Sequence, residues 1–136
     1  MGQQQLLLIV LSVIIVGIAV VIGLGLFSEG ADQANIDQVV QDVLNMGARA
    51  QQYYMKPTAL GGGGRSFTGI TVEDIGAGEN RNGDTYVVSD ADDDGVTITG
   101  TCSTALQDDD ETPVNVVADV TPVDVTTTIN KGGEEE

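Results

Sequence analysis

The sequence contains no histidine and no tryptophan, and Cys102 is its single cysteine. These absences exclude a zinc site of the usual Cys/His type, a Ser-His-Asp triad and a Cys-His catalytic pair. A lone cysteine also excludes a disulfide within the chain. Carboxylates are numerous, but the sequence sets none of them in an identifiable apolar pocket. We therefore expect that the protein is not an enzyme.

Basic residues are scarce. Five Lys and Arg stand against 21 Asp and Glu, which gives a net charge of −16 over 136 residues. Binding of nucleic acid needs clustered cations that replace the phosphate counterions, so we expect no nucleic-acid partner. The same shortage argues against docking on anionic lipid through a polybasic surface. Because only 4% of the residues are aromatic, the core of a folded domain must consist of Val, Ile and Leu.

Charge of either sign is absent from the N-terminal end, where the first charged residue is Glu29. Residues 6–27 are otherwise apolar, and four small residues interrupt them: Ser12, Gly17, Gly23 and Gly25. A membrane-spanning helix needs about 20 apolar residues. A cleaved secretory signal has a basic start and an apolar core of about 7–15 residues, which fits less well. Residues 6–27 are thus predicted to form a transmembrane helix.

Apolar residues then recur at helical spacing from Ile36 onward. The stripe consists of Ile36, Val39, Val40, Val43, Leu44 and Gly47, followed by Tyr54. This pattern predicts an amphipathic helix over residues 32–56 that packs on a domain by one face and ends before Pro57. Two arrangements remain open. Either the chain breaks near Gly30 and Asp32 or Asn35 caps a second helix, or one helix of about 80 Å runs over residues 3–56.

The remainder of the chain is predicted to be a small β domain. The glycine run within residues 57–66 is typical of a flexible linker, and it lacks the Gly-Lys-Ser/Thr of a phosphate loop. Residues 67–131 are rich in Thr, Val and Ile, and alternation predicts strands at 67–75, 84–89, 96–102, 114–120 and 123–129. Residues 132–136 form an acidic tail. The expected fold class is α+β, with a long N-terminal helix packed on an antiparallel sheet.

An acidic turn, Asp90-Ala91-Asp92-Asp93-Asp94-Gly95, lies between two of these strands. It matches the first half of a calcium loop, in which alternate carboxylates converge on one cation. The ligands would be Asp90, Asp92 and Asp94, together with the carbonyl of Val96. The twelfth position is Thr101 and not Glu, so the segment is not an EF-hand. Two interpretations remain: a calcium site, or a solvated acidic turn that keeps the sheet edge soluble.

The order of features at the N-terminus resembles that of the type IV pilins and of the pseudopilins of type II secretion. A short polar start that includes Gln5 is followed abruptly at Leu6 by the apolar run, and then by the amphipathic segment. If Met1 is the mature N-terminus, Gln5 stands where that family has a glutamate. The family's glutamate is thought to pair with the N-terminal amine of a neighbouring subunit. A glutamine can still accept a hydrogen bond but brings no charge.

The resemblance implies a structural subunit of an extracellular helical filament. The chain would be anchored in the inner membrane and would then polymerise with copies of itself, with the help of a separate pilus assembly machinery. Its implied assembly residues are Met1, Gln5, Leu6, Gly17, Gly23 and Gly25, the glycines marking where the family's helix melts in the filament. Two alternatives remain: a pseudopilin in a short periplasmic filament, and a single-span, membrane-anchored, calcium-binding surface domain.

Overall fold

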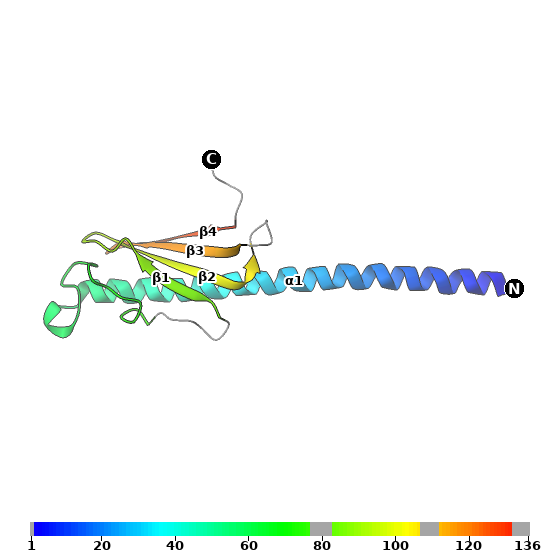
Figure 1. Ribbon diagram of the computed structural model, residues 1–136, viewed down its shortest axis with the longest axis horizontal. Helices are drawn as coiled ribbons and strands as arrows, with labels where there is room; N and C mark the ends of the chain where they lie inside the picture. The colour runs from blue at the N-terminus through cyan, green and yellow to red at the C-terminus, as the bar shows by residue number, and fades with distance from the viewer. Residues whose placement is uncertain (1, 77–82, 107–111, 132–136) are drawn as a thin grey trace, which may run out of the picture.

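The computed structural model describes residues 2–76, 83–106 and 112–131 (Figure 1). This part of the chain contains α1 (Gly2–Met55), the 3-10 helix η1 (Thr58–Leu60) and the strands β1 (Thr85–Ser89), β2 (Val96–Leu106), β3 (Pro113–Val120) and β4 (Val125–Asn130). The predicted α+β fold, a long N-terminal helix packed on an antiparallel sheet, is confirmed. Met1 and the acidic tail lie outside the described residues.

Helix α1 continues through Gly30 without a break, so the continuous arrangement is the one that forms. Its 54 residues correspond to about 80 Å at 1.5 Å per residue. One glycine costs a helix only about 1 kcal/mol, which the flanking helix formers offset. Asp32 and Asn35 therefore lie inside the helix and cap nothing. The helix ends at Met55, two residues before Pro57, whose ring cannot continue it.

The strands form one antiparallel meander in the order β1-β2-β3-β4. Four of the expected strands correspond to them, and β2 runs on past Cys102 to Leu106. The pairing of β2 with β3 changes register between Thr101 and Leu106, which marks a bulge.

Residues 67–75 do not form the strand that the sequence predicts. Phe67, Ile70 and Ile75 are buried, but the backbone turns between them. The Ile70 amide donates to the Phe67 carbonyl at 3.1 Å, and Gly69 has a φ of 81°. A strand buries every second residue, whereas these three anchors are spaced by three and by five. The prediction was wrong because the segment is a loop pinned by separate apolar side chains.

The hydrophobic core lies between the C-terminal half of α1 and the inner face of the sheet (Figure 1). Val39 and Val43 of α1 are fully buried against it, as are Ile98 of β2 and Val116 of β3. Helix and sheet approach each other closely at Gly100, where a Cβ atom would lie 2.7 Å from the nearest Val39 methyl carbon. The intervening Thr97, Thr99 and Thr101 lie on the opposite face and are only partly buried.

The glycine run folds back onto the end of α1. The amides of Gly63 and Arg65 donate to the carbonyls of Tyr53 and Tyr54 at 2.9 and 2.8 Å. Helix ends leave carbonyls without intrahelical partners, and these two bonds satisfy such carbonyls. The segment is therefore a compact C-terminal cap rather than an extended connection.

Candidate functional site

The N-terminal half of α1 extends beyond the domain and touches no other element (Figure 1). Seventeen large apolar side chains between Leu6 and Phe27 are between 53% and 80% exposed. By length and composition this half of the helix can cross a membrane. Water solvates such a surface poorly, so it needs an apolar environment, either lipid or other protein.

Met1 lies outside the described residues. The other residues that were predicted to take part in assembly all belong to this exposed half of α1. Gln5 and Leu6 lie on the first turns of α1 and are exposed. The Gln5 amide makes no hydrogen bond within the described part of the chain, so its donor and acceptor groups face outward. The Ser12 hydroxyl donates to the Leu8 carbonyl at 2.7 Å, which satisfies that polar group inside the apolar stretch.

The glycines of this half are helical and uncrowded. A Cβ atom built at Gly17, Gly23 or Gly25 meets nothing within 4 Å, whereas at Gly47 it would lie 3.1 Å from a Val125 methyl carbon. Packing within the single chain therefore leaves little room for a side chain at Gly47, whereas it leaves open space at the three N-terminal glycines. Any packing reason for those three must come from outside the chain.

A buried polar pair, Asn35 and Asp84, holds the middle of α1 against the bulge of β2. The Asn35 amide donates to Asp84 Oδ1 at 2.9 Å, and the Ser103 amide donates to the same oxygen at 2.7 Å. Asn35 Oδ1 accepts from the amides of Thr104 and Ala105, each at 3.2 Å. The bulge interrupts the regular pairing of β2 with β3, and the two side chains accept the backbone amides of β2 at that point.

Sequence reasoning missed this pair because it considered Asn35 only as a helix cap. A signal was available. Asn35 lies four residues before Val39 and eight before Val43, which places it on the buried stripe. Cys102 lies beside the pair and is 1% exposed. Burial, and then the nearby Asp84 carboxylate, raise the pKa of the Cys102 thiol to about 11. The thiol is therefore protonated and unreactive at neutral pH.

The acidic turn connects β1 and β2, and its backbone is organised by its own side chains. Asp92 Oδ1 accepts the amides of Asp94 and Gly95, each at 2.8 Å. Asp93 Oδ1 accepts the Ser66 hydroxyl at 2.6 Å and so joins the turn to the loop after α1. Asp90 adopts a left-handed φ of 49°, which Asp tolerates better than most residues.

The side chains of this turn do not gather around one point. Asp92 Oδ1 is occupied by two backbone amides, and Asp93 Oδ1 faces the Ser66 hydroxyl. Across the described residues, no group of three or more acidic or thiol side chains is close enough to hold a metal ion. Calcium binding by Asp90, Asp92, Asp94 and Val96 stays a prediction.

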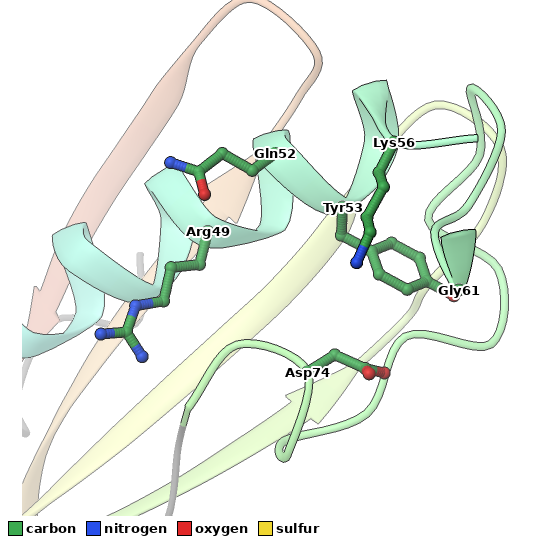
Figure 2. Close-up of a pocket in the computed structure, with 6 residues that line it drawn as sticks. All are labelled: Arg49, Gln52, Tyr53, Lys56, Gly61 and Asp74. Atoms are coloured by element: carbon green, nitrogen blue, oxygen red, sulfur yellow. The ribbon is translucent and has the colours of Figure 1, made fainter. Parts of the chain in front are cut away.

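Two of the five basic residues line a shallow pocket of about 260 Å³ at the end of α1 (Figure 2). Figure 2 shows the pocket between the last turns of the helix and the loop that carries Asp74. Its lining is Arg49, Gln52, Tyr53, Lys56, Gly61 and Asp74. Arg49 Nη1 donates to the Ile75 carbonyl at 3.2 Å, and Asp74 Oδ2 accepts from the amide and hydroxyl of Thr71. The Lys56 ammonium has no such partner in the described part of the chain.

Sequence reasoning did not single out this basic group, because it examined the predicted helix for its apolar stripe and not for its charges. Arg49 and Lys56 are seven residues apart. Seven residues are nearly two helical turns, so the two side chains share one face of α1. The pocket is open and holds no nucleophile, acid or base in an apolar setting. No protein-family model matches the chain, and no curated protein or solved structure is significantly similar to it.

Proposed function

We propose that the chain is a structural subunit of an extracellular, type IV pilus-like filament that polymerises through the apolar half of α1. The observation that carries the proposal is the contrast within one rigid helix. Its second half is buried by the domain of the same chain, while seventeen large apolar side chains of its first half are exposed. A surface of that size is stable in water only after it has been covered.

The same surface serves two environments in turn. Before assembly it lies in the inner membrane, where lipid covers it and the backbone is satisfied by the helix itself. In the filament it lies among the corresponding helices of other copies. Both environments are apolar, so an uncharged segment suits both. Packing each subunit on the next by different surfaces is a heterologous contact that does not close, and it produces a fibre.

The unbroken course of α1 supports a filament over a simple membrane anchor. A simple anchor needs about 20 residues in the bilayer, and any linker can join it to its domain. Here the helix continues directly into the core of the domain, through Gly30 and the Asn35–Asp84 pair. The domain is thus fixed relative to the apolar segment, which is what a regular repeat requires.

The test is to shear cells that express the chain and to image the sheared fraction by electron microscopy. We expect filaments that contain this chain, with an N-methylated mature N-terminus by mass spectrometry. A protein found only as a monomer in the membrane, or cleaved beyond Phe27, would overturn the proposal. The first outcome would favour the anchored surface domain. Filaments that antibodies reach only after the outer membrane is permeabilised would instead indicate a pseudopilin.

Calcium binding by the acidic turn needs its own test. Asp92→Ala is a poor probe, because it also removes the acceptor for two backbone amides. Asp94→Asn is better, since the Asp94 carboxylate makes no hydrogen bond within the described residues. A bound cation would raise the Tm of the wild type in excess calcium relative to EGTA, and Asp94→Asn would reduce this shift. An equal Tm in both buffers would favour the solvated turn.

A further inference from the structure

Charge is segregated along α1 in a way that the fold of one chain does not require. Residues 2–28 carry no charge, residues 29–42 carry only acids, and residues 43–56 carry only bases. The acids are Glu29, Asp32, Asp37 and Asp42, and the bases are Arg49 and Lys56. A helix that only needed solubility would mix the two signs at the i,i+4 spacing that stabilises it.

Two of these four acids are exposed, whereas Asp32 and Asp42 are half-buried, and the two exposed acids lie on one flank of the helix. Glu29 and Asp37 are exposed and eight residues apart, which places them within about 80° of each other. Gln51 lies between them in angle, and its amide donates to the Thr121 carbonyl at 3.0 Å, in the turn between β3 and β4. We call Glu29 and Asp37 the acidic flank; it faces the β4 side of the molecule.

The bases lie on the other flank. Arg49 is about 120–200° around the helix from the acidic flank, and Lys56 lies beside it in angle. Arg49 contacts the Ile75 carbonyl, and Asp42, at nearly the same angle, accepts the Tyr86 hydroxyl of β1 at 2.6 Å. We call Arg49 and Lys56 the basic flank; it faces the β1 side. Figure 2 shows both side chains on the side of the helix that faces the loop carrying Asp74.

We propose that the basic flank of one copy binds the acidic flank of a second copy, whose α1 runs parallel to the first. The second helix would be displaced toward the domain end by about 20–40 Å, the axial distance between the two flanks at 1.5 Å per residue. Flanks of opposite charge on opposite sides of one helix fit a head-to-tail series of copies. This inference rests on the proposed filament and adds the direction and stagger of its subunits.

Three further observations favour a second copy over another partner. The chain has a net charge of −16, so contacts between copies need their few cations placed at the interface. The basic flank lies about 30 Å beyond the apolar segment along α1, which is too far to contact the membrane that holds that segment. The helix surface just before the basic flank is also uncharged apart from the bonded Asp42, so it suits the apolar half of the displaced neighbour.

Two carboxylates, those of Asp74 and Asp42, lie near the basic flank and could compete with a partner for its bases. Asp74 lines the same pocket, but its Oδ2 already accepts the amide and the hydroxyl of Thr71 in its own turn. Asp42 is held by the Tyr86 hydroxyl and by the Gln38 amide. These carboxylates are already hydrogen-bonded within the chain, whereas the Lys56 ammonium is not. Lys56 is therefore the side chain that gains most from a partner carboxylate.

Charge reversal and charge exchange test the contact. Lys56→Glu, alone or with Arg49→Glu, should lower the yield of sheared filament at least about tenfold, because like charges would then face each other. Glu29→Lys with Asp37→Lys should do the same, although it makes the chain less acidic. The variant with all four changes keeps the net charge of the wild type and should recover most of the yield. Asp119→Lys, on the outer face of the sheet, is the matched control.

Cross-linking gives a second readout that does not depend on yield. In Gln33→Cys/Gln52→Cys the thiols lie exposed beside the two flanks, and the buried Cys102 does not react. A bismaleimide should produce a ladder of covalent oligomers from these filaments, and either single variant should give none.

Filaments of the double-cysteine variant that give no ladder, or full assembly of Lys56→Glu, would overturn this contact and leave the filament proposal intact. Absence of filaments from the wild type would overturn both. The Tm of each variant in detergent shows whether its domain is folded.

Discussion

The two halves of α1 share one backbone but differ in what surrounds them. In the first half, large apolar side chains are exposed and the glycines have open space around them. In the second half, Val39, Val43 and Ala50 are fully buried, and Gly47 is crowded by Val120 and Val125. The second half thus stabilises the fold of the single chain. The first half contributes nothing to that fold, so its composition reflects an environment outside the chain.

The two halves of α1 also differ in the titratable and polar side chains that they carry or enclose. The first half has no titratable side chain up to Glu29. The second half and the sheet enclose Asp84, Asn35 and Cys102. Substitutions in the two halves should therefore separate folding from assembly.

The largest effect is expected from placing a charge in each half. Val43→Lys buries an unpaired ammonium where the wild-type side chain is 0% exposed, and it should lower the free energy of unfolding by about 4–5 kcal/mol or more. Ile15→Lys should change that free energy by less than about 0.5 kcal/mol. Urea unfolding in detergent, followed by tyrosine fluorescence, reports the domain, because all three tyrosines belong to it.

Retention in the membrane should show the opposite order: Ile15→Lys should lose it, and Val43→Lys should keep it. A lysine at the centre of a spanning helix costs about 2.5–3.5 kcal/mol on insertion scales, so Ile15→Lys should lose membrane retention and filament formation. Equal domain destabilisation by both variants would contradict the separation of the two halves.

The elements that could be predicted from the sequence are those that depend on local patterns. Helix, sheet and their packing were predictable because period 3.6 in residues 36–54 and period 2 in Val96, Ile98 and Gly100 are local patterns. Residues 67–75 were predicted wrongly because Phe67, Ile70 and Ile75 are apolar without alternation. Only the tertiary structure shows that each anchors a separate turn.

Of the candidate site, the apolar segment was predictable because it depends on composition alone. The Asn35–Asp84 pair joins residues 49 positions apart, and the sequence contains no pattern that links them. The basic flank depends on Arg49 and Lys56 lying at nearly the same angle around the helix, and the helical pattern was examined for its apolar residues and not for its charges. Long-range pairing is set by packing, not by local propensity.

The second prediction concerns the pair that fixes the domain to α1. Asn35→Ala removes the acceptor of the Thr104 and Ala105 amides and the amide donor to Asp84. It should lower the free energy of unfolding by about 2–4 kcal/mol, because buried polar groups lose their partners. Gln33→Ala is the control, since Gln33 is exposed and, among the described residues, its side chain bonds only to Asp37. Similar stability of the two variants in urea would contradict the role of the pair.

The third prediction compares glycines in the two halves. At Gly100 an added Cβ would lie 2.7 Å from a Val39 carbon and 2.9 Å from a Val43 carbon, so Gly100→Ala should destabilise the domain by about 1–3 kcal/mol. At Gly25 the same change meets open space and should leave domain stability unaltered while raising helix stability by about 1 kcal/mol. Urea midpoints of the two variants in detergent should therefore differ, and equal midpoints would show that the sheet can move away from α1.

The smallest effect concerns pH and belongs to the covered half alone. Burial, and then the Asp84 carboxylate, raise the pKa of the Cys102 thiol to about 11, above its value in the unfolded chain. The neutral thiol is thus favoured in the folded state. The contribution of the neutral Cys102 thiol to stability is complete below the pKa that the thiol has in the unfolded chain. This contribution is lost as the pH rises toward 11. At about pH 9.5 the unfolded chain gains about 1 kcal/mol by ionising this thiol.

Other groups titrate in the same range, so the measurement is a difference between two chains. The free energy of unfolding of the wild type, minus that of Cys102→Ala, should fall by about 1 kcal/mol between neutral pH and about pH 9.5. The alanine variant has no thiol to ionise, and its own pH dependence removes the tyrosine and lysine contributions. A difference that stays constant would mean that water reaches Cys102 in the folded chain. The apolar residues 2–28 of α1 have no titratable side chain and therefore offer no counterpart to this titration.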